Sequence, residues 1–487
     1  MPLKYRCVAA VLAISAIAYW LQTQFFLESD VIYLAHAAEK LWQGGTYSQN
    51  FFETNPPLIL YLYLPALFLK TSLNINLVSA VRLCFIVLTW MQIALISNLL
   101  KKFTMSREER NSILFGVILI DLFLPSCQFA QKEHFVLVFT LPYYFLAALR
   151  LNKKNISTVL AFFVGLMAVC GFGLKPFFLL PLGFIELYLV IKLRNIRTVL
   201  RTELVTIISL LGAYICCLFL FQPDYIHTVL PLVSHYYFAS TAEPWQMIFD
   251  RAPSLYCLVV LALSPLIYRI TQYKNLAAIV SLALAGFILA YVIPQASWYY
   301  HVLPALSLAC LLIFLLVLEV KSYLLRFLLG CLLLAVPAYF AGLLYFSEFA
   351  IARNATMHKL ISLANQPRAV KVYCIPTHQA CSYLSAYTNV EYVSRFPSLW
   401  LLKGLTALPE DGHAIQDKKY LLAMVAEDMV AHHPDYIIIN TQVKLGKLQS
   451  SIDYLAYFSE NKLFQEEIRH YHLKASAGSY QIYSRIR

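Results

Sequence analysis

Long apolar segments recur along the chain up to about residue 350, and short polar segments separate them. A helix needs roughly 20 apolar residues to cross a bilayer, so this pattern predicts about eleven spans. The predicted spans lie near 7–26, 79–100, 111–127, 135–149, 156–173, 176–191, 203–221, 253–268, 275–293, 302–320 and 327–346. The apolar stretch Pro56–Phe68 begins with two prolines and contains Pro65, so we interpret it as a re-entrant or interfacial helix and not as a span.

Basic residues are concentrated in alternate connections between these spans. Those connections contain Lys4, Arg6, Lys101, Lys102, Arg107, Arg110, Arg150, Lys153, Lys154, Lys192, Arg194, Arg197, Arg201, Arg269, Lys274, Lys321 and Arg326. The intervening connections contain few, namely Lys40, Lys70, Arg82, Lys132, Lys175 and Arg251. The positive-inside rule therefore predicts a cytoplasmic N-terminus, and an odd number of spans places the C-terminus outside the cytoplasm.

The sequence changes character near residue 350. A mixed polar sequence follows, with strand-like runs at Val370–Ile375, Tyr436–Asn440 and Ser479–Ser484 and a helical stretch at Tyr420–Ala431. This pattern predicts a transmembrane domain over residues 1–349 and a small extracytoplasmic α/β domain over residues 350–487. Two cysteines in the second domain, at positions 374 and 381, lie where a disulfide is permitted, and the sequence leaves their pairing open.

The composition agrees with a membrane protein. Hydrophobic residues make up 60% of the chain and charged residues 13%, whereas ordinary soluble proteins carry about 25% charged residues. The mean hydropathy is +0.65. We therefore expect a mainly α fold, a polytopic transmembrane helical bundle with a small C-terminal α/β domain. The net charge of +12 follows from the basic cytoplasmic connections and does not indicate a nucleic acid partner.

Polar and aromatic clusters gather in the connections predicted to face outward, so we expect the chemistry there. In the first outer loop, Asp30 begins an amphipathic helix, a Gly-Gly turn follows, and Glu53 precedes a double proline. An acid in this position can simply end a span in water. The helix, the Gly-Gly turn and the double proline around Asp30 indicate an ordered loop, which favours a functional role for this acid. Glu53 is a candidate for substrate binding.

A second cluster lies between the third and fourth spans. Lys132, Glu133 and His134 follow one another at a predicted helix start. They bring cationic, basic and titratable groups together, which suits an anionic headgroup and proton transfer. Ordinary interfacial polarity is the alternative explanation.

Smaller signals accompany this cluster. Lys175 lies between apolar stretches, where an unpaired charge is unfavourable and a phosphate partner would satisfy it, although a snorkelling lysine is also possible. Tyr300 and His301 follow Trp298 in a segment that also fits an interfacial aromatic belt. Arg82, at the outer end of the second span, is a weaker candidate cation.

The first loop resembles the GT-C superfamily of polyprenyl-phosphate-sugar-dependent transferases, of the protein mannosyltransferase and aminoarabinose transferase type. The resemblance rests on the acid-tyrosine-alanine helix from Asp30, on Gly44-Gly45-Thr46-Tyr47 and on Phe51-Phe52-Glu53-Thr54-Asn55-Pro56-Pro57-Leu58. The segments Gln131–His134, Lys175-Pro176 and Trp298–His301 look like those of related bacterial members.

The resemblance implies transfer of a sugar from a polyprenyl-phosphate donor to an extracytoplasmic acceptor, with inversion. The acceptor would be an envelope glycan, a lipid or a protein. The implied location is the bacterial inner membrane, in many passes, with a periplasmic C-terminal domain. No nucleotide cofactor is expected, because no nucleotide-cradling glycine loop is present. The need for a divalent metal stays open.

The resemblance also implies roles for individual residues. Asp30 matches the acid near the acceptor, and Glu133 is a plausible second acid at a position where many relatives have aspartate. The cations around the donor phosphate would be Lys132, Lys175 and His301, with Arg82 as a weaker candidate.

Three other functions compete with this one. A lipid or solute transporter would use intramembrane acids such as Asp121 and Glu186, but the polar clusters lie on one side of the predicted membrane. A glycan polymerase or ligase would share the donor and attach a preassembled chain. A degenerate relative would serve as an assembly scaffold.

Overall fold

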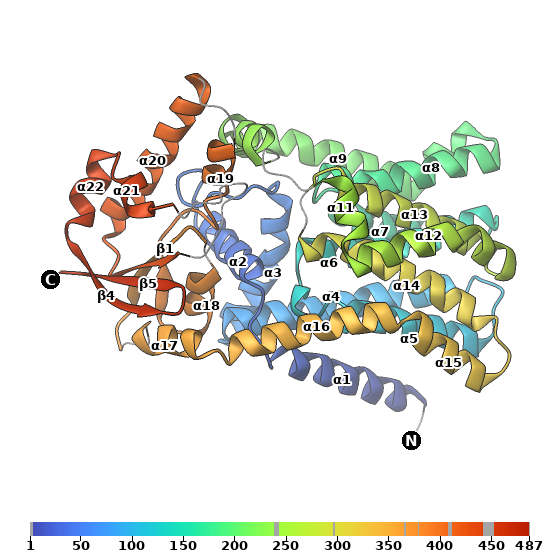
Figure 1. Cartoon of the computed structure of the whole chain (residues 1–487). Helices are drawn as coiled ribbons and strands as arrows, with labels where there is room; N and C mark the ends of the chain where they lie inside the picture. The colour runs from blue at the N-terminus through green and yellow to red at the C-terminus, as the bar shows by residue number, and fades with distance from the viewer. Residues whose placement is uncertain are drawn as a thin grey trace. The chain divides into compact units, whose positions relative to one another are not determined.

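The protein is mainly helical in the computed structural model, which describes residues 3–237, 243–295, 298–364, 367–377, 379–407, 412–441 and 452–486 (Figure 1). The chain divides into two compact units. The helical unit comprises Met1–Gln24, Val81–Cys217 and Thr241–Ser347. The mixed unit comprises Phe25–Ala80, Leu218–Ser240 and Glu348–Arg487. The first outer loop therefore belongs to the same unit as the C-terminal α/β region.

Eight helical segments among the described residues are long and apolar enough to cross a membrane. They are α4 (Leu77–Leu100), α6 (Lys132–Leu151), Pro176–Leu193 including α8 (Leu179–Leu193), α9 (Thr202–Phe221), α12 (Ala252–Ile270), α13 (Lys274–Val292), Tyr299–Leu318 including α14 (Leu303–Leu318) and α16 (Ala335–Ala352). The helices α1 (Leu3–Gln22), α5 (Arg107–Leu122) and α7 (Thr158–Phe172) lie at the other predicted spans. The predicted membrane helical bundle is confirmed, while the total of about eleven spans and their orientation stay predictions.

Two predicted segments differ in detail from the helices observed. The predicted span 327–346 covers parts of two helices, α15 (Tyr323–Leu333) and α16, which are separated at Leu334. The stretch that we interpreted as interfacial forms α3 (Leu58–Leu73), which packs on α2 (Ser29–Trp42) within the mixed unit.

The core of the helical unit is formed by α6 and α14. Both helices are apolar around most of their circumference and are buried along most of their length, as expected for a helix with neighbours on every side. Figure 1 shows them running alongside α7, α12 and α13, and these helices are in contact. Two helices approach especially closely where Gly286 of α13 faces Pro181 of α8.

Charged side chains at one end of the helical unit form a paired network. Arg150 of α6 contacts Glu203 of α9 at 2.8 Å, and Arg201 lies 3.4 Å from the same carboxylate. Arg201 also pairs with Glu186 of α8, which accepts a hydrogen bond from Tyr143. Glu186, one of the acids that a transporter would need, is therefore satisfied within a structural network that joins three helices.

The mixed unit contains a five-stranded sheet in the order β2-β1-β3-β5-β4. The strands are β1 (Val370–Ile375), β2 (Val390–Tyr392), β3 (Tyr436–Asn440), β4 (Tyr471–Ala477) and β5 (Tyr480–Arg485). β1 pairs in parallel with β2 and β3, whereas β5 pairs antiparallel with β3 and β4. The three predicted strand-like runs correspond to β1, β3 and β5.

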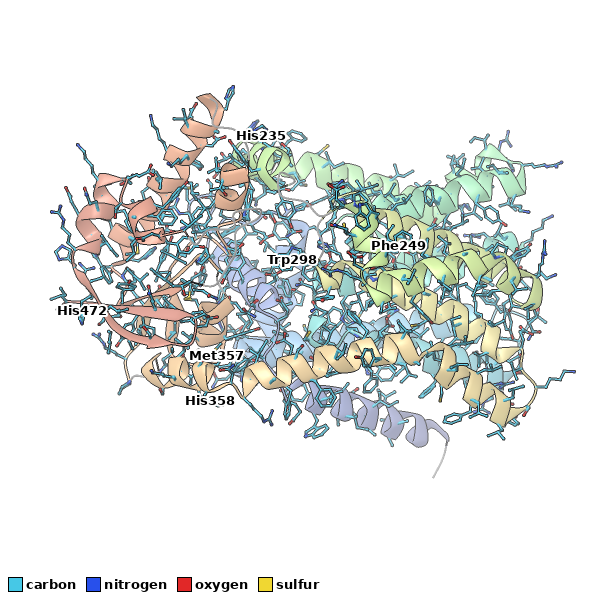
Figure 2. The ribbon with its side chains drawn as sticks, viewed as in Figure 1. His235, Phe249, Trp298, Met357, His358 and His472 are labelled. Atoms are coloured by element: carbon cyan, nitrogen blue, oxygen red, sulfur yellow. A yellow bond between two sulfur atoms is a disulfide. The ribbon has the colours of Figure 1, made fainter. Side chains whose placement is uncertain are left out.

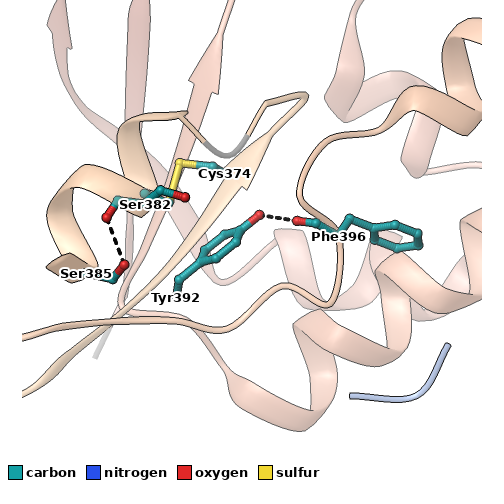
Figure 3. The surroundings of a disulfide bond; sticks show 6 residues. Cys374, Ser382, Ser385, Tyr392 and Phe396 are labelled. Carbon is teal, nitrogen blue, oxygen red and sulfur yellow. Dashed lines mark hydrogen bonds between the residues drawn. A yellow bond between two sulfur atoms is a disulfide. The ribbon is translucent and has the colours of Figure 1, made fainter. Parts of the chain in front are cut away.

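Helices cover this sheet on both sides (Figure 1). The helices of the mixed unit not yet named are α10 (Leu230–Leu232), α17 (Ala355–Ala364), α18 (Gln379–Tyr387), α19 (Trp400–Ala407), α20 (Gly412–His432), α21 (Tyr454–Phe458) and α22 (Lys462–Ile468). The short helix α11 (Pro244–Phe249) belongs to the helical unit. A disulfide joins Cys374 in β1 to Cys381 in α18, with the two Cα atoms 6.0 Å apart (Figure 3). The structure therefore pairs the two cysteines whose pairing the sequence left open.

We predict that Gly286→Ala destabilises the helical unit. A Cβ atom at this position would lie 2.5 Å from Pro181 N and 2.6 Å from Pro181 Cα, and backbone atoms cannot move aside without displacing α8. Overpacking of this kind destabilises by about 1–3 kcal/mol. The midpoint of thermal unfolding in detergent should fall. Gly342→Ala in α16 is the control, because nothing lies within 4 Å of the Cβ atom it would add; equal midpoints for the two variants would contradict the prediction.

Candidate functional site

The helical unit brings together three segments that lie far apart in the sequence. Glu133 is at their centre, and its side chain is 1% exposed. Its Oε1 atom accepts a hydrogen bond from Lys175 Nζ at 2.6 Å and lies 3.5 Å from His301 Nε2. Three connections that we predicted to face outward therefore converge on one carboxylate.

Local structure fixes each of these side chains. Glu133 lies in the first turn of α6, where a carboxylate is stabilised by the positive end of the helix dipole, and Gln131 caps that helix. Lys175 has an extended backbone, as expected for a residue before proline, and Pro176 begins a 3₁₀ helix. His301 lies in the 3₁₀ helix Tyr299–Val302, which leads into α14.

A second lysine adds to the positive charge of this group. Lys132 is 5% exposed, and its Nζ atom lies 5.5 Å from the centre of the Tyr300 ring, a cation–π arrangement. Lys132 also acts electrostatically on the carboxylate of Glu133. Lys132 and Lys175 therefore place two ammonium groups near one carboxylate. We call these residues, Lys132, Glu133, Lys175, Tyr300 and His301, the cationic cluster.

One oxygen of the central carboxylate remains available. Glu133 Oε2 is buried and has no hydrogen-bond partner among the described residues. A buried acceptor without a partner is unfavourable by about 1–3 kcal/mol, so a ligand hydroxyl or cation at this point would be stabilising. Trp298, labelled in Figure 2, precedes the cluster and is exposed, as an interfacial aromatic residue would be.

Two other predicted residues of the helical unit, His134 and Arg82, are buried. His134 Nδ1 accepts a hydrogen bond from the backbone of Ala130 at 3.1 Å, and Nε2 donates to the carbonyl of Asp121 at 2.7 Å. Its ring also packs on Phe85. This geometry orders the segment before α6, and the predicted role of His134 in substrate binding stays a prediction. Arg82, one turn before Phe85 on α4, is 4% exposed.

Asp30 and Glu53 belong to the mixed unit. Glu28 is the N-cap of α2, and its carboxylate accepts hydrogen bonds from the backbone N–H groups of Asp30 at 2.7 Å and Val31 at 3.3 Å. Asp30 lies in the first turn and is half-buried. Glu53 is buried and accepts a hydrogen bond from the backbone of Asn55 at 2.8 Å, which orders the turn before the double proline. Glu28 and Glu53 therefore support the loop that presents Asp30.

Arg395 is a residue that the sequence analysis missed. Its guanidinium donates to Asp428 at 2.7 Å and to the carbonyl of Ser48 at 2.9 Å, and its own carbonyl accepts from the hydroxyl of Tyr33 at 2.7 Å. The first outer loop is thereby fastened to α20 and to the chain after β2. An arginine in a mixed polar segment carries no sequence signal for this role, because its partners are distant in the chain.

The turn after α2 depends on glycine. Gly44 has a φ of +90°, which residues with a side chain rarely adopt. A Cβ atom on Gly45 would lie 2.9 Å from the carbonyl oxygen of Lys40. The Gly-Gly pair therefore lets the chain reverse closely against the end of α2.

No group of three or more His, Cys, Asp or Glu side chains is placed to hold a metal ion in the described ranges. The predicted site residues are divided between the two units. Asp30 and Glu53 lie in the mixed unit, whereas Arg82, His134 and the cationic cluster lie in the helical unit.

We predict that Glu39→Gln destabilises the mixed unit in a pH-dependent way. The hydrogen bond from His36 and the pairing with Lys70 at 2.7 Å hold the pKa of Glu39 at about 2, below its usual value of 4.5. Because the folded pKa is lowered, the stabilisation is present above pH 4.5 and is lost as the pH falls toward 2.

The destabilisation at pH 7 should be below about 1 kcal/mol, since the pair is partly exposed. Thermal unfolding at pH 7 and at pH 2.5 measures it, with the exposed Glu466→Gln as control. A difference between wild type and Glu39→Gln that does not shrink at the lower pH would contradict the assignment.

Comparisons with known proteins support the fold. No protein-family model matches the chain, and curated protein sequences give no significant match. The chain is similar to ArnT from Cupriavidus metallidurans in a crystal structure bound to undecaprenyl phosphate, with a TM-score of 0.57 and 9% identity over 98% of this chain and 97% of that one. The apo structure of ArnT gives a TM-score of 0.57 and 9% identity over 99% and 98% of the two chains. The chain therefore has the fold of ArnT over nearly its whole length, which confirms the resemblance to GT-C transferases at the level of the fold.

Proposed function

We propose that the protein is a membrane glycosyltransferase that moves a sugar from a polyprenyl-phosphate donor to an extracytoplasmic acceptor. The observation that carries the proposal is the cationic cluster, in which one buried lysine, one partly buried lysine and a histidine lie around one glutamate at the ends of apolar helices. The likeness to a fold that has been crystallised with undecaprenyl phosphate bound supports it.

The cationic cluster suits a lipid phosphate as the leaving group. Negative charge develops on the phosphate when the bond to the anomeric carbon breaks, and fixed cations in a water-poor site stabilise that charge strongly. Lys175 and Lys132 would contact the phosphate oxygens, and His301 would add a hydrogen bond. Glu133 keeps Lys175 in place, and its second oxygen is an acceptor for a hydroxyl of the donor sugar.

Asp30 is proposed as the base that orients and deprotonates the acceptor. Attack by an acceptor hydroxyl or amine on the anomeric carbon requires a carboxylate within hydrogen-bond reach. The attacking group loses its proton to Asp30, the new glycosidic bond forms, and the lipid phosphate leaves with the bonding electrons. A single displacement of this kind inverts the anomeric centre.

The acceptor and the location complete the proposal. The acceptor is an envelope glycan, lipid or protein, and the protein lies in the bacterial inner membrane with its C-terminal domain in the periplasm. The position of Asp30 in the mixed unit, outside the eight long apolar helices, agrees with an acceptor that arrives from water.

We predict that Asp30→Asn abolishes transfer without preventing membrane insertion, because it removes the base and keeps the shape of the side chain. Mass spectrometry of lipids and surface glycans from wild-type, Asp30→Asn and deletion cells, matched for expression, measures this. A sugar-mass difference shared by Asp30→Asn and deletion cells, with accumulation of the lipid-phosphate sugar, is the expected result.

The exposed Glu466→Gln serves as a charge-matched control and should behave as wild type. Identical glycans in all of the strains would favour transport or a scaffold function instead. A preassembled chain missing from the mutant glycans, in place of a single sugar, would identify a ligase.

We also predict that Lys175→Ala weakens the use of the donor. Loss of the ammonium should lower kcat/KM for the lipid-phosphate sugar at least about tenfold, which corresponds to about 1.4 kcal/mol of transition-state stabilisation. Lys175→Arg keeps the charge and the pairing with Glu133, so it should retain more activity. The exposed Lys192→Ala is the control. Normal donor kinetics in a folded Lys175→Ala variant would identify Lys175 as a snorkelling residue.

A further inference from the structure

We propose that the mixed unit contains a binding site for an uncharged glycan chain, separate from the cationic cluster. The site is a cavity of about 550 Å³, a volume typical of small-molecule sites. This inference deepens the proposed function, on which it rests, because it names the acceptor as a glycan of several sugar residues.

The walls of the cavity come from five parts of the mixed unit, one of which is α18 through Ser385. His36 and Lys40 face it from the second half of α2, and Gln49 faces it from the loop after the Gly-Gly turn. Tyr392 contributes from the edge strand β2, and His432 from the end of α20. Because α2 and α20 are fastened together through Arg395, these walls are held in place before any ligand arrives.

Each acid in the walls has a basic group near it, and Glu391 acts electrostatically on Lys40. Arg395 is paired with Asp428 at 2.7 Å, and Glu39 is paired with Lys70 at 2.7 Å. Lys40 donates to the backbone carbonyl of Asn50 at 3.0 Å. The cavity therefore offers little net charge to a ligand. This argues against an anion such as a phosphate and against a strongly cationic ligand.

Uncharged hydrogen-bonding groups and aromatic rings make up much of the remaining wall. The amides of Gln43 and Gln49 line the cavity. Ser385 also lines it, and its hydroxyl donates to the carbonyl of Ser382 at 3.0 Å. The hydroxyl of Tyr392 donates to the carbonyl of Phe396, so this residue offers mainly its ring (Figure 3). Amide and hydroxyl groups beside an aromatic ring match a sugar, which has hydroxyls at its edge and C–H groups on its faces.

An apolar lipid tail fits these walls poorly. Polar side chains that lose water without gaining hydrogen bonds are unfavourable by about 1–3 kcal/mol each. The side-chain amides of Gln43 and Gln49 would be in that position next to a hydrocarbon chain. A polyhydroxylated ligand replaces the lost water bonds, so a glycan is the better occupant.

The helix α2 connects this cavity with the proposed base. Ala37 lines the cavity and lies seven residues after Asp30, which is nearly two full turns, so the two residues share one side of the helix. The rise along the helix is about 10 Å from Asp30 to Ala37 and about 15 Å to Lys40. A single sugar cannot span this distance, whereas a chain of several sugars can lie in the cavity and present its end at Asp30.

Binding of oligosaccharides to the full-length protein in lipid nanodiscs, with no donor present, tests the proposal. The probes are oligosaccharides released by mild acid from the envelope lipid fraction and, separately, from the envelope protein fraction of deletion cells. Saturation-transfer NMR and titration give the contacts and the Kd. We expect one fraction to bind and inorganic phosphate not to displace it.

Two neighbouring substitutions on α20 provide a matched pair. His432→Trp fills the cavity, whereas Ala431→Trp places the same side chain at an exposed position. His432→Trp should raise the Kd at least tenfold, and Ala431→Trp should leave it unchanged. If His432→Trp fails to fold, Gln43→Ala combined with Gln49→Ala, at two exposed positions, replaces it and should also weaken binding.

The outcomes separate this inference from the proposed function. Absence of binding by either fraction, or equal binding by wild type and the cavity variants, overturns the glycan site and leaves the transferase proposal intact. Binding that is lost in His432→Trp supports the site even if the cells show no transfer, in which case only the transferase proposal falls.

Discussion

The ion pair between Lys175 and Glu133 is the interaction on which the helical unit's candidate chemistry depends. A charge buried at the end of an apolar helix is unfavourable unless another charge compensates it, so these two residues constrain where α6 and the segment before α8 can meet. The neighbouring Lys132 is buried and acts electrostatically on the same carboxylate. The constraint that aligns the helices therefore also gathers two ammonium groups near one point.

Much of the architecture was accessible from the sequence, because hydropathy and period-two alternation are local signals. The runs at Val370–Ile375 and Tyr436–Asn440 correspond residue for residue to β1 and β3. Two strands were missed for physical reasons. β2 has only three residues, and β4 is mostly exposed with a mixed polar sequence, so neither produces a long apolar or alternating pattern.

The candidate site was predictable as a set of residues but not as an arrangement. Lys175 and His301 were singled out as lone polar groups in apolar surroundings, yet they lie 42 and 168 positions from Glu133, and no local pattern predicts that they meet. The contacts that hold the loop around Asp30 were even harder to predict from the sequence. Arg395 is an ordinary arginine in a polar segment, and its importance follows only from partners that the fold brings to it.

The bond from Arg395 to the carbonyl of Ser48 joins residues separated by 347 positions, and this separation sets an order of events during synthesis. The loop that carries Asp30 emerges from the ribosome early, but the arginine that fastens it is made only after the last long apolar helix, α16, has been completed. The loop can complete its contacts only after the segment that contains Arg395 has been synthesised. A nascent or truncated protein can thus hold all of its membrane helices and still lack a completed first loop.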